Sequence, residues 1–377
     1  MFDKNSELIK KLPRNFGFGC MRLPMMDGEV DYEEFIKMAD AFVDAGFNYF
    51  DTAHGYLEGK SEIAIRECVV KRYPRESFLL TNKLSGPFFK TEEDVRKIFQ
   101  IQLEACGVDY FDIYLMHAQG RGNYPHFKQC RAYEQAFELK KEGKVKHVGL
   151  SFHDTAEYLD MILTENPEIE IVQIQFNYLD FEDADVQSRA CYEVCLKHNK
   201  PCLIMEPVKG GQLANLPTQA VEKFKELGSA SPASYAIRYC GSFENNVMIL
   251  SGMSNLEQMQ DNLSYMTEFK PLTKEEFKVI DEVKDLLETL KVIPCTGCRY
   301  CVDGCPQSIR IPDLFAYFNE EKVFTGVSRK WHYSMTTKKS GKASDCIKCG
   351  ACEDICPQHI KIRDMLETVA EHFENKN

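Results

Sequence analysis

Short apolar runs alternate with longer segments in which apolar residues recur every three to four positions. Runs of this length predict buried strands, and the longer period predicts amphipathic helices. Alternation of the two along the chain favours a parallel sheet with helical crossovers. The eight runs lie at residues 17–20, 47–52, 77–83, 111–117, 145–151, 171–177, 201–207 and 247–252.

The segments between the runs carry helix signals. Thr91 with Asp94, and Thr273 with Glu276, have the spacing of a capping box, which predicts that a helix begins at each threonine. The first segment places a set of apolar side chains on one helical face: Phe35, Met38, Ala39, Phe42 and Val43.

Eight strand–helix units predict an α/β protein whose sheet closes into a (β/α)8 TIM barrel over residues 1–290. A doubly wound open sheet is the alternative, but no GxGxxG follows the first run. Residues 291–377 form a second, smaller domain in this interpretation, with the boundary near 291–294.

That smaller domain contains one cysteine motif twice. CTGCRYCVDGCP and CIKCGACEDICP both read C-x2-C-x2-C-x3-C-P, their flanks CPQSIRIPDL and CPQHIKIRDM match, and the offset is 51 residues (346 minus 295). In such a run three cysteines bind one [4Fe–4S] cluster and the fourth binds the other cluster. Zinc and disulfides are the alternatives, but zinc sites typically use paired C-x2-C units. The predicted sets are Cys295, Cys298, Cys301 and Cys356 for the first cluster, and Cys346, Cys349, Cys352 and Cys305 for the second.

The duplicated segment resembles the bacterial two-cluster ferredoxins, which implies a small ferredoxin-like domain with two [4Fe–4S] clusters. The chain has 16 cysteines. It shows no secretory h-region and no apolar run of membrane-spanning length, so we expect a cytoplasmic protein in a reducing compartment. The remaining eight cysteines are expected to be small buried residues.

Charge is distributed unevenly. The net charge is −12; residues from 291 onward carry 13 basic and 11 acidic side chains (+2), so the rest carries 33 and 47 (−14). An acidic barrel argues against nucleic acid and anionic membranes as partners.

Four polar side chains come at or just after the ends of successive predicted strands: Asp51, Tyr56, Lys83 and His117. Each alone has an ordinary explanation, as a cap, a packed ring, a solvated amine or a core imidazole. Because the reactive groups of (β/α)8 barrels lie at the carboxyl ends of the strands, the four together predict a catalytic site.

The segments around these four residues resemble a known enzyme family. FDTAHGYLEGKSE, LTNK and DIYLMH are similar to the signatures of the aldo-keto reductases, and the resemblance covers residues 16–265. It implies an NAD(P)-linked enzyme that interconverts a carbonyl and an alcohol. Tyr56 would be the general acid, Lys83 paired with Asp51 would lower the pKa of Tyr56, and His117 would hydrogen-bond the substrate oxygen.

The resemblance also implies nicotinamide contacts, namely Gly19, Cys20, Met21, Ser151, Gln173, Gly210, Gly252 and Asn262. Phe152 stands where the family commonly has Asn, and Met205 and Glu206 stand where it usually stacks an aromatic ring. Gly252 and Gln258 replace the basic residues that hold a 2′-phosphate. An NADP(H) preference is therefore not expected, and NAD(H) becomes competitive.

Clusters pass single electrons, whereas a nicotinamide passes a hydride, and a flavin typically converts between them. Several interpretations stay open. In the first, the barrel binds a flavin in place of nicotinamide. In the second, a partner flavoprotein makes the conversion. In the third, the clusters are structural or redox-sensing and the barrel works alone. A protein of another class, an electron-transfer or regulatory subunit with a non-catalytic barrel, is the alternative function. The substrate, a small carbonyl or alcohol, is not identified; Arg121 and His126 are candidates to bind an anionic one.

The segment between the two motifs predicts a helix that begins near Pro312 and carries Leu314, Phe315 and Phe318 at helical spacing. Basic residues follow around Trp331, the only tryptophan. They predict either a solvated loop or a docking surface for an acidic ferredoxin or flavodoxin. The set is Lys322, Arg329, Lys330, Lys338, Lys339 and Lys342.

Overall fold

The computed structural model describes residues 15–324 and 326–374 and divides them into two compact units. One unit contains the described residues up to Pro207 and the segment Ala236–Leu272. The other contains Val208–Tyr235 and the described residues from Thr273 onward.

The first unit is a closed barrel of parallel strands in the order β1-β10-β9-β8-β7-β6-β5-β4. Each predicted apolar run overlaps one of these strands, so the (β/α)8 prediction is confirmed and the open-sheet alternative is wrong. The strands are β1 (Phe16–Gly19), β4 (Tyr49–Asp51), β5 (Leu79–Leu84), β6 (Phe111–Gln119), β7 (Val145–Phe152), β8 (Ile171–Gln175), β9 (Cys202–Met205) and β10 (Asn246–Ser251).

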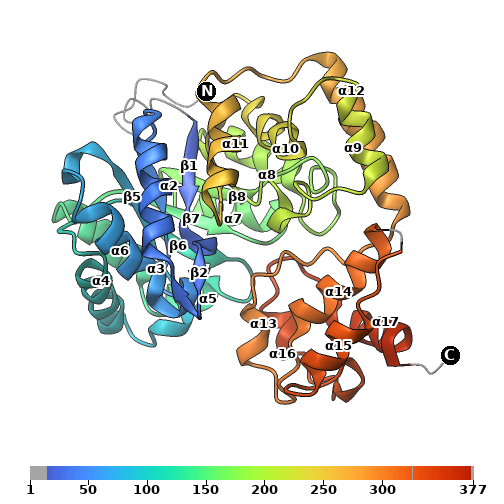
Figure 1. Cartoon of the computed structure of the whole chain (residues 1–377). Coiled ribbons are helices and arrows are strands. Elements are labelled where there is room, and N and C mark those ends of the chain that lie inside the picture. Colours follow the sequence, from blue (N-terminus) through green and yellow to red (C-terminus); the bar gives the residue numbers. More distant parts are fainter. Residues whose placement is uncertain (1–14, 325, 375–377) are drawn as a thin grey trace. The chain divides into compact units, whose positions relative to one another are not determined.

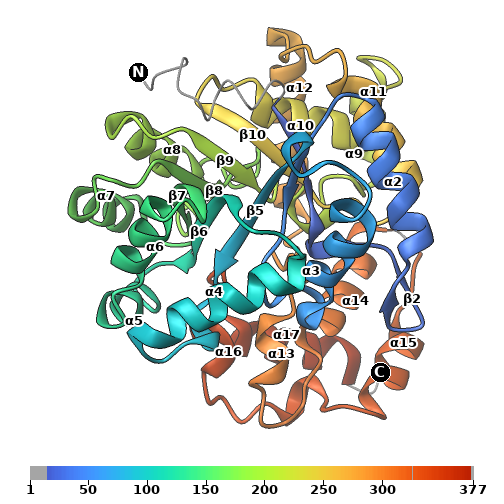
Figure 2. The ribbon, with the colours of Figure 1, turned by 90° about the vertical axis from the view of Figure 1, so that its left-hand side faces the viewer.

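Helices surround this ring, and Figure 2 shows α6, α7 and α8 outside strands β6, β7 and β8. Thr91 and Asp94 form the predicted capping box at the start of α4. The helices of the barrel sequence are α2 (Tyr32–Asp44), α3 (Lys60–Ile65), α4 (Glu92–Cys106), α5 (Tyr124–Gln129), α6 (Ala132–Lys141), α7 (Ala156–Glu165), α8 (Ser188–Lys197), α10 (Pro232–Gly241) and α11 (Leu256–Met266). A small hairpin, β2 (Met25–Met26) with β3 (Glu29–Val30), follows β1.

A compact apolar cluster packs between the barrel strands. It consists of Tyr49, Leu79, Ile113, Leu115, Ile171, Leu203, Met248 and Leu250. Gly149 in β7 is required by this packing, because a β-carbon there would lie 2.5 Å from the backbone oxygen of Ile171 on β8.

The second unit is helical in its described parts (Figure 1). Helix α12 begins at the predicted capping box of Thr273 and Glu276. It packs beside α9, and Lys223 donates to Glu282 across them at 2.6 Å. The helices are α9 (Thr218–Lys225), α12 (Lys274–Thr289), α13 (Tyr300–Asp303), α14 (Ile311–Val323), α15 (Lys330–Thr337), α16 (Ala351–Asp354) and α17 (Ile362–Glu374).

Helix α14 confirms the helix predicted after the first cysteine motif. Pro312 lies in its first turn, and Leu314, Phe315 and Phe318 are buried in the core of the unit. The segment 208–235 and α12 also belong to this unit, although they precede residue 290. The division of the chain at 290 stays a prediction. Within the described residues, no helix combines the length and apolarity needed to cross a bilayer.

Candidate active site and cysteine cavities

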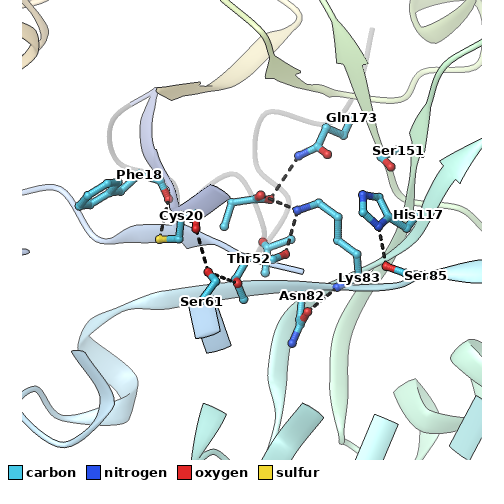
Figure 3. Close-up of polar contacts among 12 residues, drawn as sticks. Phe18, Cys20, Thr52, Ser61, Asn82, Lys83, Ser85, His117, Ser151 and Gln173 are labelled. Carbon is cyan, nitrogen blue, oxygen red and sulfur yellow. Dashed lines mark hydrogen bonds and ion pairs between the residues drawn. The ribbon is translucent and has the colours of Figure 1, made fainter. Parts of the chain in front are cut away.

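A buried ion pair lies at the carboxyl ends of β4 and β5. Lys83 Nζ donates to Asp51 Oδ1 at 2.5 Å and to the carbonyl of Thr52 at 2.8 Å, and the Lys83 side chain is fully buried. Burial raises the pKa of Asp51 and lowers the pKa of Lys83, while the attraction between the two charges opposes both shifts. Gln173 on β8 donates to the other Asp51 oxygen at 3.2 Å (Figure 3).

Tyr56 begins the 3-10 turn that follows β4, and Lys83 Nζ lies 4.7 Å from the centre of its ring. Burial, followed by the charges of Asp51 and Glu206, raises the pKa of Tyr56 well above its ordinary value. This direction is opposite to the sequence expectation, because burial is the largest cause and Asp51 acts in the same direction. The phenol is therefore protonated at neutral pH and carries a proton to donate.

His117, near the end of β6, completes the predicted set. Its ring centre lies 5.9 Å from that of Tyr56. Burial, followed by Lys83 and His153, lowers the pKa of His117 well below its ordinary value, so the imidazole is neutral at pH 7. Its Nδ1 shares a 2.6 Å hydrogen bond with Ser85 Oγ, which leaves Nε2 to face other partners (Figure 3).

Most sequence-predicted nicotinamide contacts of this unit lie in or next to barrel strands, while Asn262 lies in α11. Most of them make hydrogen bonds within the chain. Ser151 Oγ accepts from the backbone of Ala118 at 2.7 Å, and Asn262 accepts from Ser251 at 2.7 Å. Cys20 donates to the carbonyl of Phe18 at 3.5 Å. Met21 and Gly252 are half-buried, and a β-carbon added to Gly19 would lie 3.4 Å from the carbonyl oxygen of Ser251. Gly210, in contrast, belongs to the second unit.

An ion pair that the sequence did not predict lies beside Gly252. Arg22 Nη2 lies 3.4 Å from Glu206 Oε1, and a β-carbon added to Gly252 would lie 3.6 Å from the aliphatic carbons of Arg22. Glu206 holds this position with a left-handed backbone (φ +56°) just after β9. The basic side chain at Gly252 is thus already paired with a carboxylate.

Two cavities in the second unit are lined by cysteines and otherwise mainly by apolar side chains. The first is lined by Cys295, Cys298, Cys301 and Cys356. The second is lined by Cys305, Cys346, Cys349 and Cys352. Each cavity therefore has four sulfur donors, the set that an iron–sulfur cluster requires.

The candidate anion-binding residues after β6 have structural partners. Arg121 lies 3.4 Å from Asp154 and donates to Thr155 at 3.0 Å. His126 stacks on Phe89 with ring centres 4.7 Å apart.

In the basic segment of the second unit, Lys330–Thr337 form helix α15, so the expectation of a loop is wrong there. Trp331 on this helix is 67% exposed, which rules out a role as the core of the insert. Arg329 pairs with Glu320, whereas Lys330, Lys338, Lys339 and Lys342 are exposed.

Comparison with known proteins identifies both parts of the chain. The family model "Aldo/keto reductase family" matches residues 15–285, most of the chain. The chain belongs to the aldo/keto reductase family. A second model, "4Fe-4S dicluster domain", matches residues 294–360, so this reductase is an oxidoreductase with a C-terminal iron–sulfur domain, as its sequence predicted.

Curated relatives of the reductase are distant. A 9,11-endoperoxide prostaglandin H2 reductase of Trypanosoma cruzi is 25% identical over 64% of this chain and 80% of its own. An NADH-specific methylglyoxal reductase of Escherichia coli is 30% identical over 42% of this chain and 52% of its own length.

Solved aldo-keto reductases share the fold. One from Bacillus halodurans, in its holo form, superposes with a TM-score of 0.56 at 23% identity, covering 71% of this chain and 91% of its own. One from Klebsiella pneumoniae in complex with NADPH gives 0.58 at 19% identity, covering 72% and 90%.

Sequence reasoning missed Ser85 and the Arg22–Glu206 pair. A signal for Ser85 existed, because it follows Lys83 by two residues and side chains two apart along an extended segment share a face. No comparable signal marked Arg22 and Glu206, which are 184 residues apart.

The Ser85–His117 hydrogen bond generates a prediction. We assign Ser85 Oγ as the donor to Nδ1, which fixes the tautomer with a proton on Nε2, the form that can donate to a carbonyl oxygen. We expect Ser85→Ala to mix the two tautomers and lower kcat/KM for carbonyl reduction about tenfold, with Ser85→Thr close to wild type. Nitrogen-15 NMR of histidine-labelled protein, combined with kinetics, measures both effects. An unchanged tautomer in Ser85→Ala would contradict the assignment.

Proposed function

We propose that the barrel interconverts a small carbonyl compound and an alcohol, with Asp51, Tyr56, Lys83 and His117 as its catalytic set. The observation that carries the proposal is the convergence of these four side chains at the ends of three neighbouring strands. A buried Lys–Asp pair, a protonated phenol over the ammonium and a neutral imidazole are brought together there. Perturbed groups of this kind gather at functional sites.

Each residue has a role that follows from its surroundings. Tyr56 donates its proton to the carbonyl oxygen as that oxygen gains negative charge, and the nearby Lys83 ammonium stabilises the resulting phenolate. Asp51 keeps Lys83 charged and fixed in place. His117 donates from Nε2 to the same oxygen and orients it. A nicotinamide bound at the strand ends supplies the hydride.

Removal of the phenol hydroxyl tests the catalytic set. We expect Tyr56→Phe to lower kcat for aldehyde reduction by a factor of about 10²–10⁴, the usual contribution of a general acid. Absorption of the clusters should not change, which shows that the second unit is intact. Near-full turnover in Tyr56→Phe would exclude Tyr56 as the acid and leave an electron-transfer or regulatory role for the barrel.

The cofactor proposed is NAD(H) rather than NADP(H). Three features support it: Gly252 and Gln258 carry no charge, and Arg22 beside Gly252 is paired with Glu206. The Escherichia coli relative is NADH-specific by name, although the Klebsiella pneumoniae neighbour binds NADPH.

Titration of both cofactors at one ionic strength gives the test. We expect NADH to bind at least as tightly as NADPH, and Glu206→Gln to shift the preference toward NADPH by releasing Arg22 for a 2′-phosphate. Tighter NADPH binding by the unmodified protein would contradict the proposal. The absorption spectrum of the anaerobically purified protein would reveal a flavin in its place.

The two cysteine cavities are proposed to hold two [4Fe–4S] clusters with crossed ligation, in a protein of the reducing cytoplasm. Cys356 would complete the set of the first motif, and Cys305 would complete that of the second. Support comes from the lining of each cavity, which combines three cysteines of one motif with the last cysteine of the other.

Crossed ligation predicts which cluster a given substitution damages. Cys305→Ala should alter the electron paramagnetic resonance signal of the cluster built on Cys346, Cys349 and Cys352, although Cys305 is closer in sequence to the other set. Cys298→Ala marks the first cluster for comparison. Damage confined to the cluster that Cys298→Ala affects would overturn the crossing.

The clusters are proposed to exchange electrons with a small acidic carrier such as a ferredoxin or flavodoxin, which docks on the basic segment around Trp331. The exposed lysines and the exposed indole support this over a purely solvated loop. Clusters that exchange no electrons with such a carrier would favour a structural or redox-sensing role.

Salt dependence distinguishes a charged docking surface from a solvated loop. The rate of cluster reduction by a ferredoxin should fall steeply as ionic strength rises past about 0.1 M, where the screening length is about 10 Å. Charge reversal by Lys338→Glu with Lys339→Glu should lower the rate and flatten the salt dependence. Stopped-flow absorption measures both, and a rate indifferent to salt and charge would leave the segment, helix α15 included, as a solvated surface.

A further inference from the structure

The loop that follows β9 makes a close contact with the first cysteine motif, inside the second unit. We refer to residues 208–213 as the 208–213 loop. Gly210 in this loop has φ +63°, and a β-carbon added to it would lie 2.7 Å from the Cα of Thr296 and closer still to the Thr296 carbonyl oxygen. Real β-carbons essentially never come within 3.0 Å. Only glycine therefore permits this approach.

A hydrogen bond next to this contact reaches a predicted cluster ligand. Gln212 Nε2 donates to the carbonyl oxygen of Cys295 at 2.8 Å. On the other side, Asn319 of α14 binds the backbone of Ile293 through both its amide oxygen (2.8 Å) and its amide nitrogen (2.7 Å). Cys295 and the buried Thr296 are thus held between α14 and the 208–213 loop.

The leading cysteines of the two motifs share one kind of support. The backbone nitrogen of Cys295 donates to Ile293 at 2.8 Å, and that of Cys346, the equivalent residue, donates to Ala343 at 3.3 Å. Cys346 directly follows the 3-10 turn Ala343–Asp345. The first motif has an added support from a segment of the middle of the chain, because Gln212 donates to the carbonyl of Cys295.

We propose that the 208–213 loop is a positioning element for the first cluster: Gly210 admits the backbone of Thr296, and Gln212 holds the carbonyl of the ligand Cys295. The inference rests on the proposed ligation of Cys295, Cys298, Cys301 and Cys356. It also gives Gly210 a role different from the nicotinamide contact that family resemblance implied.

The amide of Gln212 presents the positive end of its dipole to the peptide that carries Cys295. Reduction adds one negative charge to a cluster, and hydrogen bonds and charges around a cluster set its potential. Gln212→Glu keeps the size of the side chain, removes the donor and adds a negative charge. Both changes disfavour the reduced state of the first cluster. The second cluster does not contact Gln212 through its leading cysteine, so its potential is expected to stay the same.

The test is a redox titration followed by electron paramagnetic resonance under anaerobic conditions. Cys298→Ala identifies the signal of the first cluster independently of the crossed ligation. At a fixed potential, Gln212→Glu should lower the ratio of reduced to oxidised first cluster about tenfold, a shift of 59 mV for one electron. The iron content and the second cluster should not change. Gln219→Glu, on an exposed residue of α9, is the matched charge control.

Gly210→Ala provides a second measurement. Its β-carbon would push Thr296 away, so a chelator should remove the first cluster severalfold faster than in the unmodified protein, while the second cluster is lost at the usual rate. If this variant does not fold, the Gln212 and Gln219 pair still decides the matter.

Three results would overturn the inference. They are an unshifted first cluster in Gln212→Glu, equal shifts of both clusters, or an equal shift in Gln219→Glu. If Cys298→Ala leaves every cluster signal unchanged, the proposed ligation fails first, and this inference fails with it.

Discussion

The ion pair between Lys83 and Asp51 is the constraint on which the barrel site depends. Both charges are buried, and an ion in the protein interior is tolerated only when it is paired and its remaining hydrogen-bonding capacity is filled. The pair meets this condition through the carbonyl of Thr52 and the amide of Gln173. Removal of either partner would leave an uncompensated buried charge, at a cost of about 3–5 kcal/mol.

This network ties together the ends of strands that are far apart around the ring. Asp51 joins β4 to β5 through Lys83 and to β8 through Gln173. Ser85 holds His117 at the end of β6, and Ser151 of β7 accepts from the backbone of Ala118. The polar groups are therefore held in place before any ligand arrives, which is how a site avoids reorganisation during a reaction.

Apolar periodicity was sufficient to predict the barrel, because each strand is buried on both faces and each helix on one. Once the strands were predicted, the rule that reactive groups of such barrels lie at the carboxyl ends of the strands pointed to Asp51, Lys83 and His117. Contacts between distant segments could not be read in this way. Arg22 and Glu206, or Gln212 and Cys295, meet only after the chain has folded, and no spacing in the sequence records their approach. The raised pKa of Tyr56 likewise depends on burial, which a motif does not report.

The second unit is built from two stretches of chain, Val208–Tyr235 and the residues from Thr273 onward. During synthesis the ribosome releases α9 while α12, its packing partner, has still to be made, and β10 and α11 emerge in between. The 208–213 loop must likewise wait for Cys295 and Thr296. The last barrel strand is thus synthesised before the iron–sulfur unit can fold. The clusters are therefore expected to assemble late in the folding of the chain.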